Sequence, residues 1–220
     1  MMMTSRISVR LIVIAALALP LLGGCATTYY DAMERAGIHK RDILADRVKD
    51  ARDSQVDAQK QFKSALEQFA SVVKLKDTDL KKAYEKLNAE YEDCKKAAEK
   101  VSARIGRVEA VADALFDEWK HELDLYKRAD LRASSRKQLE ATQSRYRGML
   151  AGMHRAEKGM KPVLGTFYDN VLFLKHNLNA QAITSLNVEF SALRGKIDTL
   201  VRVMNESIES SNTFIADLKQ

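Results

Sequence analysis

The fold is decided by residues 80–119, LKKAYEKLNAEYEDCKKAAEKVSARIGRVEAVADALFDEW. Apolar side chains recur in this stretch at alternating steps of four and three residues: Leu80, Tyr84, Leu87, Tyr91, Cys94, Ala98, Val101, Ile105, Val108, Ala112, Leu115 and Trp119. Alternating steps of four and three make the heptad repeat of a coiled coil, which places one apolar seam against partner helices. The stretch therefore predicts a long helix whose seam other helices must cover.

A similar seam precedes this helix, over residues 44–72. One column of the seam holds Val48, Gln55, Phe62 and Phe69, and the other holds Leu44, Ala51, Ala58, Ala65 and Val72. Small side chains in such a seam let neighbouring backbones approach closely. The pattern breaks at residues 74–79, where Asp77 or Thr78 is a suitable N-cap for the next helix.

Two more helical segments follow residue 119. A turn at residues 127–130, capped by Asp130, leads into a seam of Leu139, Thr142, Tyr146, Met149, Met153, Ala156 and Met160. The seam continues beyond Pro162 through Phe167, Val171, Leu174 and Leu178, and a last one runs from Ile183 through Leu186, Phe190, Leu193, Ile197 and Leu200 to Met204. Pro162 either kinks the third helix or starts a new one. The kink is favoured, because a third helix that continues beyond Pro162 has nearly the same length as the second.

These segments predict an all-α protein, an elongated antiparallel coiled-coil bundle of three to four long helices. Four helices in up-down-up-down order result if the chain turns near residues 177–179. A three-helix coiled coil with a bent third helix is the alternative architecture. No segment alternates with a period of two residues, so we expect no sheet.

The N-terminus has the three parts of a secretory signal. Arg6 and Arg10 precede an apolar run, Leu11–Leu22, that is too short to span a bilayer, and small residues follow in Leu22-Gly23-Gly24-Cys25. The cysteine after the small residues resembles a bacterial lipobox. The resemblance implies that Cys25 carries the lipid, so membrane lipid is one partner, and that cleavage occurs before Cys25. An ordinary signal peptide or an uncleaved anchor with a chance cysteine is the alternative.

This interpretation divides the chain into a lipoprotein signal peptide (1–24), a lipidated N-terminus with a short linker (25–36) and a helical-bundle domain (37–220). Ala26 follows the cysteine, whereas inner-membrane lipoproteins of Gram-negative bacteria usually have aspartate there. We therefore expect a lipid-anchored protein of the bacterial cell envelope, on the periplasmic side of the outer membrane.

Charge and cysteine content exclude some functions. The whole chain has a formal net charge of +6, and removal of the two arginines of the signal lowers it to +4. Acidic and basic residues alternate along the chain, so no basic face for nucleic acid is expected. With Cys25 acylated, Cys94 has no disulfide partner within the chain, and its seam position predicts a small buried side chain.

Two groups of residues are candidate interaction sites. His39, Lys40 and Arg41 lie close to the lipid anchor and would form a membrane-proximal basic face; interleaved aspartates make an ordinary solvated face the alternative. Lys175, His176, Asn177 and Asn179 interrupt an apolar helix. They are either an interaction tip or the turn that joins two helices.

No catalytic, cofactor or metal site is predicted. Glu118 and His121 form a single Glu-x-x-His pair, whereas di-iron bundles need two such pairs and further inward-facing carboxylates. No G-x-x-x-x-G-K-[ST] loop for phosphate is present. The remaining residues do not provide a catalytic site with a nucleophile, a base and a group that orients the base, so we expect no enzyme.

Several stretches together resemble a known family: residues 29–31 (YYD), 37–44 (GIHKRDIL), 115–119 (LFDEW) and 172–180 (LFLKHNLNA). They are similar to the bacterial lipoproteins of domain-of-unknown-function family 2959, over about residues 29–218. The resemblance implies no activity, ligand or binding residue.

The expected function is that of a non-enzymatic structural, scaffold or adaptor protein with an envelope protein as its partner. A peripheral membrane-surface module that binds lipid with a basic face is the alternative. Whether copies of the chain associate stays open.

Overall fold

The structure is a computed structural model that describes residues 30, 33, 37–74 and 80–218. This part of the chain forms four helices and contains no strand: α3 (Lys40–Val72), α4 (Leu80–Leu123), α5 (Ala129–His176) and α6 (Ala180–Leu218). They have 33, 44, 48 and 39 residues. At 1.5 Å per residue, their lengths range from about 50 to about 72 Å. The predicted elongated helical bundle is confirmed.

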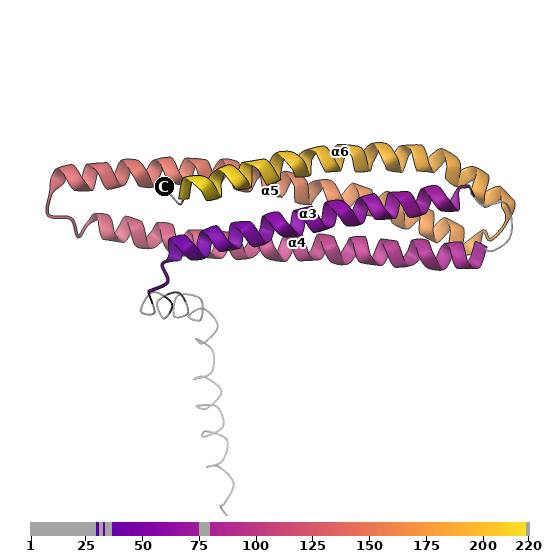
Figure 1. The fold of residues 1–220 in the computed structure, drawn as a ribbon, viewed down its shortest axis with the longest axis horizontal. Helices are drawn as coiled ribbons and strands as arrows, with labels where there is room; N and C mark the ends of the chain where they lie inside the picture. Colours follow the sequence, from indigo (N-terminus) through magenta and orange to yellow (C-terminus); the bar gives the residue numbers. More distant parts are fainter. Residues whose placement is uncertain (1–29, 31–32, 34–36, 75–79, 219–220) are drawn as a thin grey trace, which may run out of the picture.

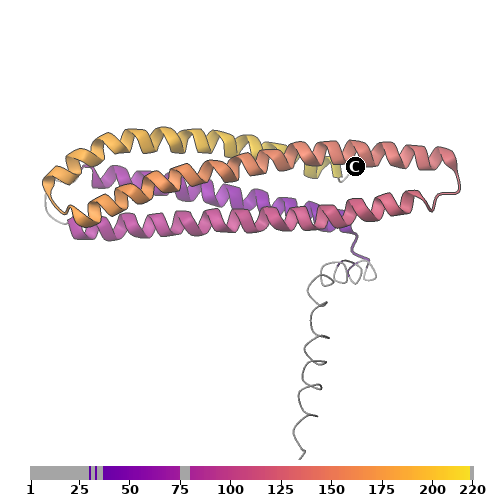
Figure 2. The ribbon, with the colours of Figure 1, turned by 180° about the vertical axis from the view of Figure 1, so that it is seen from behind.

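The four helices form a closed ring. α3 and α5 each pack against both α4 and α6, and consecutive helices run in opposite directions (Figure 1). Figures 1 and 2 show that α4 and α5 extend beyond the start of α3 and the end of α6. We call this the hairpin end, because it holds the α4–α5 connection, residues 124–128. The opposite end, with the α5–α6 connection at residues 177–179, is the turn end.

The heptad seam of α3 is buried along its whole length. All nine side chains of its two predicted columns, from Leu44 to Val72, are at most 1% exposed. Alanine occupies three of these positions, which lets α3 lie close to the helices on both sides. On α4 the predicted seam is buried as well, except that Tyr84, Tyr91, Ala98 and Trp119 are half-buried.

Aromatic rings join all four helices near the turn end. The ring of Phe69 on α3 lies 6.2 Å from that of Phe167 on α5 and 5.8 Å from that of Phe190 on α6, centroid to centroid. Tyr91 on α4 meets Phe167 edge-on at 6.0 Å. Aromatic pairs at such separations contribute about 0.5–1.5 kcal/mol each beyond their buried area. This layer fixes the relative positions of the four helices at the turn end.

Helix α5 continues through Pro162 without interruption, which confirms the single long third helix and excludes the three-helix alternative. Proline removes the hydrogen bond that the carbonyl of Lys158 would accept. Both Pro162 and Lys158 are exposed, so water can bind that carbonyl.

Two predicted details at the ends of α5 are wrong. The helix ends at His176 rather than including Leu178, because the side-chain Nδ2 of Asn177 donates to the carbonyl of Phe173 at 2.9 Å. Leu178 is 46% exposed. At the other end Asp130 is not the cap; it lies in the first turn, where hydrogen bonds from Arg128 lower its pKa. The predicted N-cap of α4, Asp77 or Thr78, lies outside the described residues.

One layer of the core is polar. Gln55 of α3 is fully buried, and neither its amide oxygen nor its amide nitrogen has a hydrogen-bond partner among the described residues. The Oγ of Ser207 on α6 is equally unpartnered. Arg52 and Gln59 donate across to Asn212 (2.8 Å) and Asn205 (2.7 Å) of α6, which places Gln55 level with Ser207. Burial of an unpaired amide costs about 1–3 kcal/mol.

A chain of polar side chains ties α4 to α5. The imidazole of His154 on α5 lies between Glu109 of α4 (Nε2 to Oε1, 3.0 Å) and Glu157 (Nδ1 to Oε2, 2.9 Å). Ser102 of α4 donates to the second oxygen of Glu157 at 2.5 Å. The hydrogen bond to Glu157 raises the pKa of His154, although partial burial opposes it. Burial raises the pKa of Glu157, but its bonds to Ser102 and His154 outweigh this and lower it.

Replacement of Gln55 by leucine is expected to stabilise the bundle. The substitution removes an unpaired amide from the core at nearly constant volume and should raise the free energy of unfolding by about 1–3 kcal/mol. Chemical denaturation followed by circular dichroism measures this. The exposed Gln138 offers a matched control, for which Gln138→Leu should change little. A loss of stability in Gln55→Leu would show that the amide is satisfied in the folded protein.

The His154 contacts should make stability depend on pH. Because the folded pKa of His154 is raised above 6.5, its contribution is fully present below pH 6.5 and is lost as the pH rises through the folded pKa. The contribution of Glu157, whose folded pKa lies below 4.5, is lost only as the pH falls through that lower value. The thermal midpoint of His154→Gln should therefore fall furthest below that of the unsubstituted protein between pH 4.5 and 6.5.

Thermal unfolding across the pH range measures this difference. His121→Gln is the control, because His121 is exposed on α4 and its side chain makes no hydrogen bond or ion pair with a described residue. A deficit of His154→Gln that stayed constant into alkaline solution would contradict the assignment.

Candidate functional site

The predicted lipidation residue, Cys25, lies outside the described residues. Two residues close to it are described, and both contact the bundle: Tyr30 is 8% exposed and belongs to the core, and Met33 packs against it. None of the described helices combines the length and apolar content that crossing a bilayer requires.

The three residues of the predicted basic face do not form one surface. Lys40 is only 4% exposed, and its Nζ donates to Oε1 of Glu118 on α4 at 2.7 Å. Arg41 is exposed and lines a cleft of about 420 Å³ together with Asp217 near the end of α6. His39 is exposed just before α3 begins. The expectation that Lys40 belongs to an exposed basic face is therefore wrong, because an acidic residue of α4 neutralises it inside the bundle.

The predicted polar cluster lies at the turn end, where it closes α5 and leads into α6. The backbone N–H of Asn177 donates to the carbonyls of Phe173 and Leu174, and Asn179 donates to Asn177 at 2.9 Å. Lys175 and His176 are exposed in the last helical turn, where the unpaired carbonyls favour positive charge. The residues thus form the turn; their role as an interaction tip stays a prediction.

Exposed large apolar side chains gather at the two ends of the bundle. At the turn end they are Tyr168, Leu172, Phe173, Leu178 and Val188, which are 38–72% exposed. At the hairpin end they are Leu125, Tyr126 and Leu131, and Ile38 lies just before α3 begins. Single exposed apolar residues are ordinary, but five at one end of the bundle, three on α5, one on α6 and one in the connection between them, favour a contact surface.

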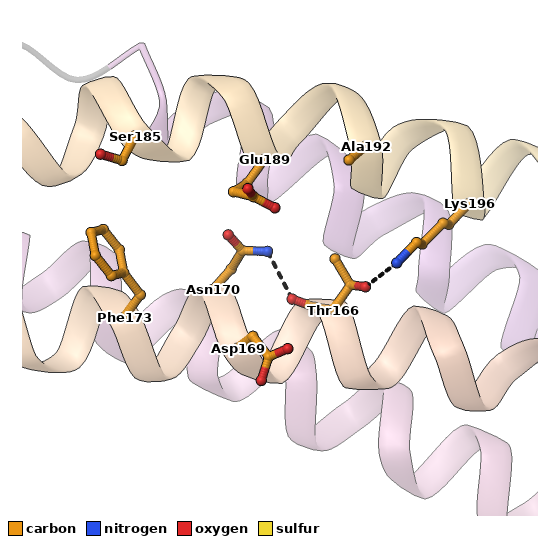
Figure 3. A pocket seen from close by; sticks show the side chains of 8 residues that line it. All are labelled: Thr166, Asp169, Asn170, Phe173, Ser185, Glu189, Ala192 and Lys196. Carbon is orange, nitrogen blue, oxygen red and sulfur yellow. Dashed lines mark hydrogen bonds between the residues drawn. The ribbon is translucent and has the colours of Figure 1, made fainter.

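A cleft of about 520 Å³ opens between α5 and α6 at the turn end, next to these apolar residues. We call it the acceptor cleft. It is lined from α5 by Thr166, Asp169, Asn170 and Phe173 and from α6 by Ser185, Glu189, Ala192 and Lys196. Figure 3 shows the ring of Phe173 and the carboxylate of Glu189 pointing into the space between the two helices.

The polar atoms of the acceptor cleft are divided between its two ends. Near Phe173, the Nδ2 of Asn170 donates to the carbonyl of Thr166 at 2.7 Å, so its oxygen faces Glu189 (Figure 3). No described residue donates to this oxygen, nor to the carboxylates of Asp169 and Glu189. At the other end, Lys196 donates to the hydroxyl of Thr166. The cleft therefore has hydrogen-bond acceptors without a described donor at one end and the ammonium group of Lys196, which is bound to Thr166, at the other.

A second cleft of about 360 Å³ continues from the first along α5 and α6. We call it the apolar groove. The two share Ala192 and Lys196, and the groove is otherwise lined by Gly159, Pro162, Val163, Gly195, Thr199, Leu200 and Val203. Its floor is mostly small or aliphatic, and the hydroxyl of Thr199 donates to the carbonyl of Gly195 within α6, so the groove offers mainly apolar surface.

Among the other side chains that could act as nucleophiles or metal ligands, Cys94 is buried between helices. Burial raises the pKa of the Cys94 thiol to about 12, and its Sγ donates to the carbonyl of Gln61 at 3.7 Å. A thiol with so high a pKa is not a nucleophile near neutral pH. In the described part of the chain no three residues of the types His, Cys, Asp and Glu are placed to hold a metal ion.

Sequence reasoning missed the acceptor cleft, although one signal was present. Asn170 continues the seam Val163, Phe167, Asn170, Leu174 with steps of four, three and four, so a polar side chain occupies a core position. That position predicts a buried amide, and Asn170 is 4% exposed. The partners across the cleft come from α6, and the seam alone does not name them.

Comparison with known proteins gives one match. No curated protein and no solved structure matches the sequence. Residues 29–218 match the family DUF2959, described as protein of unknown function. The match spans all four helices and confirms the resemblance seen in the sequence. The chain therefore belongs to the DUF2959 family.

Proposed function

We propose that the protein is a lipid-anchored lipoprotein of the bacterial cell envelope that acts without catalysis as a scaffold or adaptor. The observation that carries the proposal is the placement of exposed apolar side chains and the acceptor cleft at the turn end, opposite the end where the chain enters the bundle. Such a surface suits a partner protein better than a substrate, because its clefts are open and hold no set of catalytic groups.

The length of the bundle gives the lipid anchor and the turn end a large separation. α3 begins at Lys40, the first helical turn after the linker, and runs toward the turn end for 33 residues. That length corresponds to about 50 Å. A lipid on Cys25 would thus hold one end of the molecule, while the apolar residues at the other end reach away from the point of attachment.

Polar bridges between helices support a spacer role. Arg104 and Lys100 of α4 contact Asp50 (2.9 Å) and Asp57 (3.0 Å) of α3. On the other side of α3, Gln59 donates to the carbonyl of Val201 on α6 at 3.3 Å. These contacts are individually weak at an exposed surface. They oppose sliding of one helix past another, because each fixes a register between two helices.

The adaptor role is favoured over a lipid-binding surface module. The latter depends on a basic face near the anchor, and Lys40, the middle residue of that face, is buried in an ion pair with Glu118. The neighbouring Arg47 and Arg52 also contact aspartates on their own helix. Little unpaired positive charge is left on this part of α3 to attract an anionic membrane.

Replacement of Cys25 should release the protein from the membrane. Two or three acyl chains hold a protein effectively permanently, whereas an unlipidated bundle has no such anchor. For Cys25→Ala, we expect loss of incorporated labelled fatty acid and accumulation of the longer precursor, measured by metabolic labelling and gel mobility. Cys94→Ala is the control and should keep the label. Fatty acid retained in Cys25→Ala would refute the lipoprotein assignment.

Photocrosslinking in living cells should identify the partner and its contact face. Photoreactive residues at Lys49 (α3), Lys95 (α4), His176 (the end of α5) and Lys196 (α6) sample the four helices of the full chain. We expect one defined envelope protein to be captured at His176 and Lys196, because Lys196 lines the acceptor cleft and His176 ends α5 one turn beyond Phe173. We expect no capture at Lys49 or Lys95, because these lie on α3 and α4, which do not line the cleft. Capture of phospholipid or of a second copy alone would refute the adaptor role.

A further inference from the structure

We propose that the acceptor cleft binds a basic side chain, lysine or arginine, of the partner protein, and that the adjoining apolar groove holds apolar side chains next to it. The inference rests on the proposed adaptor function and gives the partner a chemistry.

Two oxygen-bearing side chains near Phe173, those of Asn170 and Glu189, have no donor among the described residues. The amide orientation of Asn170 is fixed, because its Nδ2 lies 2.7 Å from the carbonyl of Thr166 and only a donor is tolerated there. The amide oxygen must then face the carboxylate of Glu189 across the cleft (Figure 3). Asn170 is only 4% exposed, so its amide is held in place by the surrounding helices. Acceptors that face each other across an open cleft favour a ligand that supplies several hydrogens.

Ammonium and guanidinium groups supply those hydrogens together with positive charge. An ammonium has three donors and a guanidinium five, and neither has an acceptor. Hydrogen bonds between such cations and carboxylates are about twice as strong as neutral ones. Glu189 offers a carboxylate from α6, and Asp169 adds a negative charge on α5 with its carboxylate turned away from Glu189 (Figure 3); neither forms an ion pair with a described residue. The cleft thus has the charge complementary to a basic side chain.

Phe173 adds an aromatic ring to the acceptor cleft. Phe173 is 40% exposed, and its ring stands in the cleft opposite Ser185, one helical turn along α5 from Asn170 (Figure 3). The face of an aromatic ring attracts a cation within about 6 Å. Lys196 does not occupy the position proposed for the partner's cation. It lies seven residues beyond Glu189 on α6, about 10 Å along the helix, and donates to Thr166.

The apolar groove favours a protein segment over a free amine. It starts at Ala192 and Lys196, where the acceptor cleft ends. Gly195 leaves open space on its outer side, since a Cβ built there meets no atom within 4 Å. A small free cation would fill the acceptor cleft and leave this surface bare, whereas a segment with a basic and then apolar residues covers both.

Peptide binding to the full-length chain in detergent micelles tests the inference. The probe is a labelled, capped peptide of one arginine and two leucines, and its binding is followed by fluorescence anisotropy. A matched peptide carries citrulline, which keeps the shape of arginine and removes its charge. We expect the arginine peptide to bind at least about tenfold more tightly than the citrulline peptide.

Three variants separate the parts of the site. Glu189→Gln should weaken binding of the arginine peptide about tenfold. Glu209→Gln makes the same change at an exposed site of α6 far from the cleft and should leave it unchanged. Gly195→Leu adds an apolar side chain to the wall of the apolar groove, at a position where a Cβ meets no atom within 4 Å, and it should weaken binding of both peptides.

Several results would overturn the inference. Equal binding of the two peptides would do so, as would equal effects of Glu189→Gln and Glu209→Gln. Displacement of the peptide by free spermidine at the same concentration as the peptide would show that any small cation suffices. No binding up to about 1 mM, the weak limit for so small a ligand, would remove the site. Because the assay uses purified protein, failure here combined with capture of a partner in cells would remove this site and leave the adaptor function standing.

Discussion

The structure depends on one constraint: four apolar seams must be buried together. Each helix is amphipathic along its length and has no other means of covering its seam, so none of the four is stable in isolation. The alanine-rich seam of α3 lets α4 and α6 approach it from both sides. The core is consequently a narrow column along the axis, and side chains available for recognition are confined to the ends and to the outer lines where two helices meet.

Polar side chains inside this column give it a defined register. A polar residue at a seam position costs stability but penalises wrong alignments of the helices. Gln55 of α3 and Ser207 of α6 are both buried at about the same level of the bundle, so a shift of one heptad would move these polar groups apart. The Glu109, His154 and Glu157 contacts have the same effect between α4 and α5, since they join residues 45 apart in sequence.

The helices were predictable because their signal is local, whereas the site was not, because its contacts are between distant residues. Heptad spacing placed the seam of α3 correctly from Leu44 to Val72. The burial of Lys40 depends on Glu118, 78 residues away, and no local pattern shows that pairing. Asn170 occupied a visible seam position, but its orientation toward Glu189 follows from how α6 lies against α5. The end of α5 depended on one side-chain bond of Asn177, which a repeat does not encode.

The two ends of the described chain lie beside each other. Arg41 at the start of α3 and Asp217 near the end of α6 line the same cleft, and Figure 1 shows the C-terminus next to the first turn of α3. A short linker could therefore join the two ends, and new termini could be opened in the exposed connection at residues 124–128. Such a circular permutant would keep every seam contact. The order in which the helices are translated is thus separable from the architecture they form.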